Sequence, residues 1–141
     1  MTDGAPDEPR TRLHHTHLFA SDIDASLRFY QQWFGAEVLG DEVFAGARNV
    51  LVAIGGGRLN FYDQPPRDRG RNAVHHLGIQ TEDLDGLVAR MRAGGVPFRK
   101  PITDTPDLSY VMVEGPDGVL LELFQADPAD HTGGTAQWFA W

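Results

Sequence analysis

The chain has 141 residues, the usual size of one domain. A chain of this length can bury enough apolar surface to fold without disulfides or structural metal ions. Its 12 Lys and Arg against 20 Asp and Glu give a net charge of −8, the wrong sign for a protein that binds the phosphates of nucleic acid. The absence of cysteine excludes disulfides, thiolate metal sites and cysteine nucleophiles, so any metal must be held by His, Asp or Glu.

Residues 1–12 are predicted to form a disordered tail. They are polar, with two prolines and scattered charge, and have too little apolar surface to order themselves. The segment lacks the basic and then apolar pattern of a signal peptide, and no stretch approaches 18 consecutive apolar residues. We therefore expect a cytoplasmic protein with neither a membrane nor a nucleic-acid partner.

A strand, a helix and three strands are predicted between residues 13 and 64. The first strand covers 13–20, and an apolar stripe at helical spacing follows over 22–34, with Ser21 or Asp22 as the cap and Gly35 at the end. Strands are expected near 36–43, 48–54 and 58–63. The glycine run 55–57 indicates a hairpin turn; a phosphate-binding loop is the weaker alternative, because it needs a helix directly after the glycines.

The same order of elements is predicted again after a linker at 65–73. A strand covers 74–80, and a helix with its apolar stripe over 84–91 ends at Gly94 and Gly95. Strands are expected near 97–100, 108–114 and 118–125, the last pair joined by the turn signal Pro116–Gly118. Residues 126–141 form a C-terminal tail.

The two halves also match in register. His15 and His76 stand equally far before Asp22 and Asp83, and a helix opens after each Asp. The spacing from His15 to Asn60 nearly equals that from His76 to Glu122. Internal duplication is the simplest explanation.

Four motifs of the repeat carry a family resemblance. The chain resembles the vicinal-oxygen-chelate superfamily, which includes glyoxalase I, methylmalonyl-CoA epimerase, fosfomycin-resistance enzymes, extradiol dioxygenases and the metal-free bleomycin-resistance binders. The resemblance covers residues 13–125. The motifs are His15-x-x-Leu18-x-x-x-Asp22, Phe29-Tyr30-x-x-x-Phe34-Gly35, His76-x-x-Ile79-x-x-x-Asp83 and Pro116-Asp117-Gly118-x-x-x-Glu122.

The resemblance implies an α+β fold of two tandem βαβββ modules, 13–64 and 74–125, whose curved mixed sheets form an open cleft. It also implies that His15, His76 and Glu122 bind a divalent metal ion. Two imidazoles and one carboxylate suit Fe, Mn, Ni, Co or Zn and leave positions open for a substrate, which the ion would polarise as a Lewis acid. The alternative for each histidine is a hydrogen-bonded structural residue. The fourth ligand position falls on Asn60, where glyoxalase I has a glutamate.

Other residues of the cleft follow from the alternation of strand side chains. His17 shares a face with His15 and is the candidate general base, with a core or metal-supporting histidine as the alternative. His14 and His75 are expected on the opposite faces. The candidate substrate-binding residues are Asn60, Tyr110, Met112 and Phe124, with Leu120 beside them, although core packing would explain the apolar ones equally well.

Three functions remain open. The preferred one is a metal-dependent enzyme of glyoxalase or dioxygenase type, acting on a small oxygen-bearing substrate by proton-transfer chemistry of the lyase, isomerase or epimerase kind. The alternatives are an Fe(II)-dependent extradiol-type dioxygenase and a non-catalytic, ligand-sequestering protein of bleomycin-resistance type. The resemblance implies a homodimer with two-fold symmetry. The aromatic end, Trp138 to Trp141, is expected to cover the domain, a partner subunit or the cleft mouth.

Overall fold

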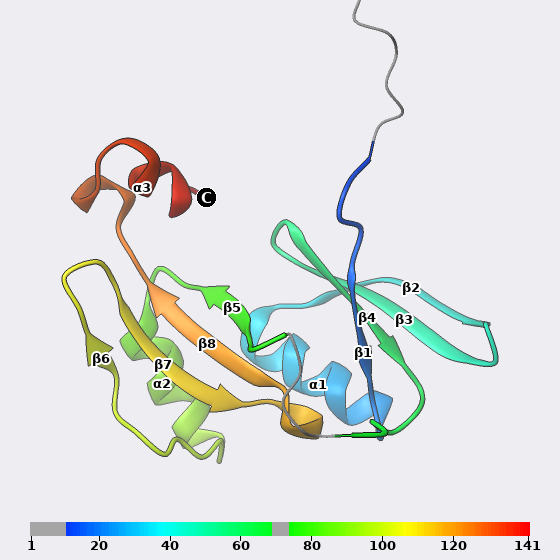
Figure 1. Ribbon diagram of the computed structural model, residues 1–141. Helices are drawn as coiled ribbons and strands as arrows, with labels where there is room; N and C mark the ends of the chain where they lie inside the picture. The colour runs from blue at the N-terminus through cyan, green and yellow to red at the C-terminus, as the bar shows by residue number, and fades with distance from the viewer. Residues whose placement is uncertain (1–10, 69–73) are drawn as a thin grey trace, which may run out of the picture.

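A computed structural model gives the fold of the chain (Figure 1) and describes residues 11–68 and 74–141. Residues 1–10 of the predicted N-terminal tail and residues 69–73 of the predicted linker lie outside the described residues. The first module contains β1 (Thr16–Phe19), α1 (Ile23–Phe34), β2 (Glu37–Phe44), β3 (Ala47–Ile54) and β4 (Gly57–Tyr62). Its sheet has the order β1-β4-β3-β2, with β1 parallel to β4 and the other neighbours antiparallel.

The second module repeats this topology. It contains β5 (Leu77–Gln80), α2 (Leu84–Ala93), β6 (Thr103–Asp104), β7 (Ser109–Glu114), the 3₁₀ turn η1 (Pro116–Gly118) and β8 (Leu120–Gln125). Its sheet has the order β5-β8-β7-β6, and β5 is parallel to β8. His17 pairs with Asn60 in the first sheet, and Gly78 pairs with Glu122 in the second. The predicted α+β fold of two βαβββ modules is confirmed.

The strand predicted at 97–100 is wrong. That segment has no regular structure, and the short strand β6 begins later, at Thr103. Pro97 begins the segment and Pro101 follows it, and neither has a backbone N–H for a sheet hydrogen bond. Val96 and Phe98 pack against the core instead, so their apolar character reflects burial outside the sheet.

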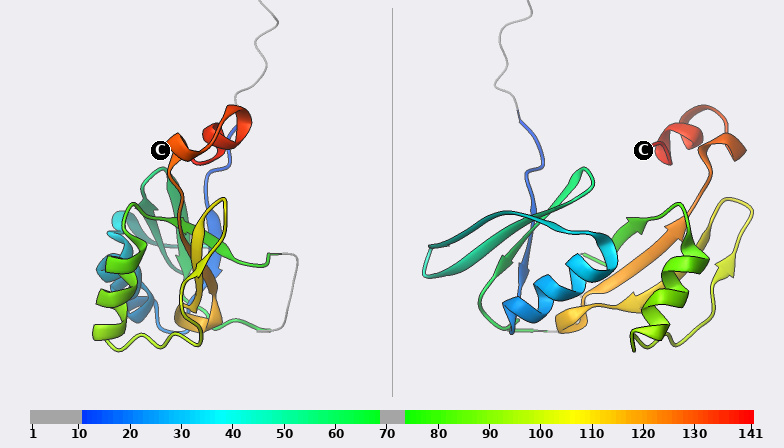
Figure 2. Two further views of the ribbon diagram at one scale, coloured as in Figure 1. Left: turned by 90° about the vertical axis from the view of Figure 1, so that its left-hand side faces the viewer. Right: turned by 180° about the vertical axis from the view of Figure 1, so that it is seen from behind.

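The two helices lie on one side of the molecule, where they cover one face of each sheet (Figure 2). Asp22 and Asp83 cap them, each accepting a hydrogen bond from a backbone N–H in the first turn. The helices and sheets share one apolar core, which includes Leu27, Tyr30, Phe61, Leu87, Met91, Leu121 and Leu123. Neither α1 nor α2 covers the other face of each sheet, and the residues of that face are the candidates for a site.

The turn at Pro116–Gly118 connects the modules. The carboxylate of Asp117 accepts hydrogen bonds from the backbone N–H of Ser21, at 3.1 Å, and from the Ser21 hydroxyl, at the start of α1. Asp117 itself has a left-handed backbone conformation, with φ of 60°. The motif that carried the family resemblance therefore fixes the second module against the first helix.

The chain ends with the 3₁₀ turn η2 (Pro128–Asp130) and the short helix α3 (Gly133–Trp138), so the C-terminal tail is structured. Within the described residues, no helix has the length and apolar character needed to cross a membrane.

Candidate functional site

His76 and Glu122 lie together on the open face of the second sheet. Nε2 of His76 is 3.6 Å from Oε2 of Glu122, and both side chains are partly exposed. Gly78 pairs with Glu122 on one side, and Met112 pairs with it on the other. Gly78 has no side chain, and a Cβ at this position would lie 3.5 Å from the ring of Phe124. An imidazole nitrogen and a carboxylate oxygen so placed are two donors that a divalent ion accepts.

His15 does not join this pair within one chain. Among residues 11–68 and 74–141, no three His, Asp or Glu side chains are close enough to hold one ion. His15 belongs to the segment before β1, in the other module, and Asn60 lies on the adjacent strand β4. The first module therefore carries one of the three predicted ligands and the second module carries two, and the metal site stays a prediction.

The histidines beside the two candidate ligands contact them directly. Nδ1 of His14 is 2.9 Å from Nδ1 of His15, and Nδ1 of His75 is 2.7 Å from Nδ1 of His76. This contact engages Nδ1 of His76, and Nε2 is the nitrogen that faces Glu122. His14 and His75 were predicted to lie outside the site, but each of them contacts the candidate ligand that follows it in the sequence.

His17 lies on the open face of the first sheet, next to Asn60. Its Nδ1 is 3.1 Å from the amide nitrogen of Asn60, and that nitrogen also donates to Oδ1 of Asn49 at 3.0 Å. Rings of Phe19 and Tyr62 flank the imidazole, with centroids 5.8 and 5.1 Å away. His17, the catalytic residue predicted from the sequence, therefore contacts a polar network and lies between two aromatic rings.

The apolar residues predicted to bind substrate share a face with Glu122. Tyr110 pairs with Phe124 and Met112 pairs with Glu122, which places all four side chains on the open face of the second sheet. The intervening residues of β7 and β8 are buried against α2. This face can offer an apolar surface beside the carboxylate, and the role of these residues in substrate binding stays a prediction.

The C-terminal tail folds back over this open face. Phe139 is buried, and its ring lies 6.2 Å from that of Phe124 and 4.9 Å from that of His131. The side-chain amide of Gln80 donates to the carbonyl of Phe139 at 2.8 Å. Of the three destinations left open by the sequence, the domain's own open face is the one that Phe139 occupies.

Replacing Phe139 by Ala is expected to release this tail. The ring contributes on the order of 2 kcal/mol of packing, so amide hydrogen exchange over 127–141 should accelerate about tenfold or more while the sheets stay protected. Trp138→Ala is the matched control, because that neighbouring side chain is 81% exposed. Equal acceleration in both variants would contradict the docking of Phe139.

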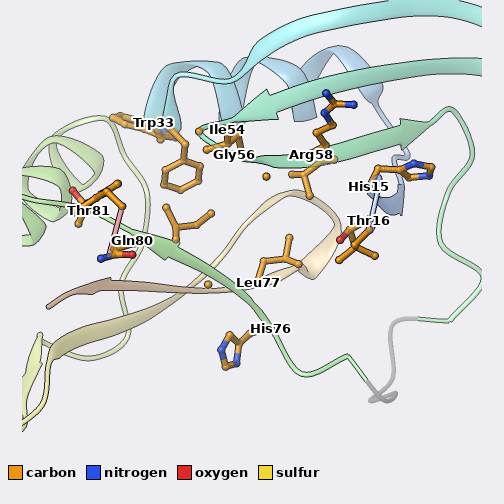
Figure 3. A pocket seen from close by; sticks show the side chains of 18 of the residues that line it. His15, Thr16, Trp33, Ile54, Gly56, Arg58, His76, Leu77, Gln80 and Thr81 are labelled. Carbon is orange, nitrogen blue, oxygen red and sulfur yellow. The ribbon is translucent and has the colours of Figure 1, made fainter. Parts of the chain in front are cut away.

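A pocket of about 880 Å³ lies where the two modules meet (Figure 3). His15 and His76 line it at separate places, together with Trp33 and the hairpin turn at 55–57. Glu122, His17 and the predicted apolar substrate residues are absent from its lining. The pocket thus contains the two candidate histidine ligands, whereas Glu122 and His17 lie outside it, on the open faces of the sheets.

Sequence reasoning missed Asn49. This residue is 4% exposed and lies in the first half of β3, just before the apolar run 50–54, on the face opposite the helix. Its one signal in the sequence was a side-chain amide within a run of strand-forming residues. Burying such an amide costs free energy unless it is hydrogen-bonded. The pairing of β3 with β4 is what brings it to Asn60.

Comparison with known proteins agrees with this architecture. The family model of the glyoxalase/bleomycin resistance protein/dioxygenase superfamily matches residues 12–123. A Vibrio cholerae protein named probable lactoylglutathione lyase is 28% identical over 133 residues, which cover 86% of this chain and 95% of that protein.

Two solved structures show the same fold. The fosfomycin resistance protein FosX from Listeria monocytogenes superposes with a TM-score of 0.70 at 20% identity, covering 88% of this chain and all of the other. TnmS3, an antibiotic binding protein from Streptomyces sp. CB03234, superposes with a TM-score of 0.66 at 26% identity, covering 84% of this chain and 99% of the other.

Proposed function

Because this chain belongs to the glyoxalase/bleomycin resistance protein/dioxygenase superfamily, we propose that it is a divalent-metal-dependent enzyme acting on a small oxygen-bearing substrate. The observation that carries the proposal is the pair formed by His76 and Glu122, 3.6 Å apart on an open sheet face. A bound ion would act there as a Lewis acid on a substrate oxygen.

The residues present fit such an ion if two copies of the chain supply it. His76 and Glu122 are two of the three proposed ligands, and the third, His15, lies at the equivalent place in the other module. A second copy that placed its first module against this second module would bring His15 to the pair. We therefore propose a homodimer in which each metal site is shared between subunits, in keeping with two-fold symmetry.

Proton-transfer chemistry of lyase, isomerase or epimerase type is the preferred reaction. The named relative from Vibrio cholerae is a probable lyase, and a crystal structure of Listeria FosX contains Mn(II). In this chain the open faces supply His17 and the apolar residues around Glu122 for contact with a substrate. None of these features selects one substrate.

Ligand sequestration without catalysis is the second candidate, and the likeness to the antibiotic binding protein TnmS3 favours it. The two functions differ in what they require of Glu122. A sequestering protein needs no carboxylate beside His76, whereas a metal enzyme needs both side chains.

The proposal is tested by metal titration of the protein prepared without a His tag. Mn²⁺, Co²⁺, Ni²⁺, Zn²⁺ and, without oxygen, Fe²⁺ are added to chelator-treated protein, and bound metal is measured after dialysis. We expect about one ion per chain, and loss of affinity on the order of 100-fold or more in His76→Ala and Glu122→Gln. Glu114→Gln, an exposed carboxylate of the same sheet, is the control.

Oxygen uptake with catechol by the Fe²⁺-loaded protein separates the dioxygenase alternative. Wild-type protein that binds none of these ions, or variants that bind as tightly as the wild type, would overturn the metal assignment.

A further inference from the structure

Two buried asparagines connect the backbone of the first sheet to His17. Asn49 is 4% exposed and Asn60 is 8% exposed, in a layer where most neighbours are apolar. Buried amides keep a single orientation when each of their atoms faces a defined partner. The orientation of this pair can be followed from one end to the other.

The network begins at atoms that can only accept. The side-chain nitrogen of Asn49 lies 3.0 Å from the carbonyl oxygen of Phe44 and 3.1 Å from that of Ala47. A carbonyl oxygen has no hydrogen to donate, so the atom of Asn49 that faces both must be the NH₂ group. Oδ1 of Asn49 is therefore fixed as an acceptor on its other side.

Asn60 is oriented next. The atom that faces Oδ1 of Asn49 at 3.0 Å must donate, so it is the amide nitrogen of Asn60. The second hydrogen of that nitrogen points to Nδ1 of His17, at 3.1 Å. Nδ1 can accept this bond only if it carries no hydrogen. The neutral imidazole must then carry its hydrogen on Nε2.

We propose that Asn49 and Asn60 are positioning residues that hold His17 in its Nε2–H form, so that it presents a hydrogen-bond donor on the open face of β1. His17 is exposed there, between the rings of Phe19 and Tyr62. Such a donor between aromatic rings suits an oxygen acceptor, a carbonyl or an oxyanion, on a planar or apolar substrate.

In this form His17 cannot have the role of general base that the sequence predicted. A general base needs a nitrogen lone pair that faces the substrate, but here the lone pair of Nδ1 faces Asn60 and Nε2 carries a hydrogen. His17 would polarise a substrate oxygen by donating this hydrogen bond, and any proton that is transferred must move through other residues. The assignment rests on the proposed function only in taking this face as the substrate's side.

The test is the tautomer of His17 in chelator-treated, metal-free protein. Long-range ¹H–¹⁵N correlation spectra of ¹⁵N-labelled protein distinguish protonated from unprotonated imidazole nitrogens, and His17→Gln identifies the signals. The spectra of the wild type and the variants are recorded in the same mildly alkaline buffer. We expect an unprotonated Nδ1 and a protonated Nε2 in the wild type.

Asn60→Asp is the decisive variant, because a carboxylate can accept but not donate and should draw the hydrogen of His17 to Nδ1. Asn60→Gln, which keeps the two hydrogens of a side-chain amide, is the matched control and should leave Nε2 protonated. A protonated Nδ1 in the wild type, or the same tautomer in wild type and Asn60→Asp, would overturn the inference. Since no metal is present, these outcomes do not depend on whether the protein binds one.

Discussion

Mixing two variants that each lack a metal ligand, His15→Ala and His76→Ala, is expected to restore metal binding that neither variant shows alone. In a shared site the first module of one subunit faces the second module of its partner. A mixed dimer then holds one site with both defects and one site with neither. With random pairing, half of the dimers are mixed, so about a quarter of all sites should be intact.

The measurement is bound Mn²⁺ per chain after the two variants are co-expressed or unfolded and refolded together. Mixing His76→Ala with Glu122→Gln is the matched control, because both defects lie in the second module and every shared site contains one of them. Restoration in the control, or none in the first mixture despite mixed dimers on a two-tag pull-down, would reject shared sites.

This experiment matters because the strands of one chain place only two donors together. His76 and Glu122 meet across the parallel strands β5 and β8, whereas His15 precedes β1 in a separate sheet. A monomeric site would need the first module to swing onto the second. That movement would break the hydrogen bonds between Ser21 and Asp117, which fix the modules as they stand.

Local patterns in the sequence were sufficient to predict most of the fold. The apolar stripe that begins at Ile23 predicted α1, and alternation predicted that Met112 and Phe124 share a face with Glu122. Alternation works because it depends only on the two-residue period of a strand. The same reasoning was wrong for the segment 97–100, because the prolines at positions 97 and 101 lack the backbone N–H donors that a strand needs.

Contacts between segments that are distant along the chain could not be predicted from the sequence. Asn49 reaches Asn60 only because β3 and β4 pair in one register, and a shift by one residue would turn Asn49 to the helix side. The docking of Phe139 on Phe124 depends on a turn and a short helix whose direction no periodic pattern encodes. The candidate ligands could be proposed from the repeat and the family resemblance, but the contacts of Asn49 and Phe139 could not.

Methylglyoxal with glutathione, the substrate pair of lactoylglutathione lyases, is expected to be turned over weakly by the wild-type protein. A relative with that name shares 28% identity with this chain, but the family resemblance places Asn60 where glyoxalase I has a glutamate. A carboxamide cannot take a proton as a carboxylate can, and proton transfer by a positioned base contributes about 10²–10⁴-fold to turnover. Both amide hydrogens of Asn60 are moreover engaged by Asn49 and His17, which leaves Oδ1 as its one atom able to approach a metal.

We therefore expect kcat at least about 100-fold below that of the Vibrio cholerae relative, assayed beside it with the same bound metal. Metal content measured in the same samples separates a missing base from a missing ion. Adding a carboxylate by Asn60→Glu should not restore turnover, because the new oxygens would face Oδ1 of Asn49, which cannot donate. Turnover equal to that of the relative would show that a base elsewhere on the open faces replaces the glutamate, and that Asn60 does not determine the reaction.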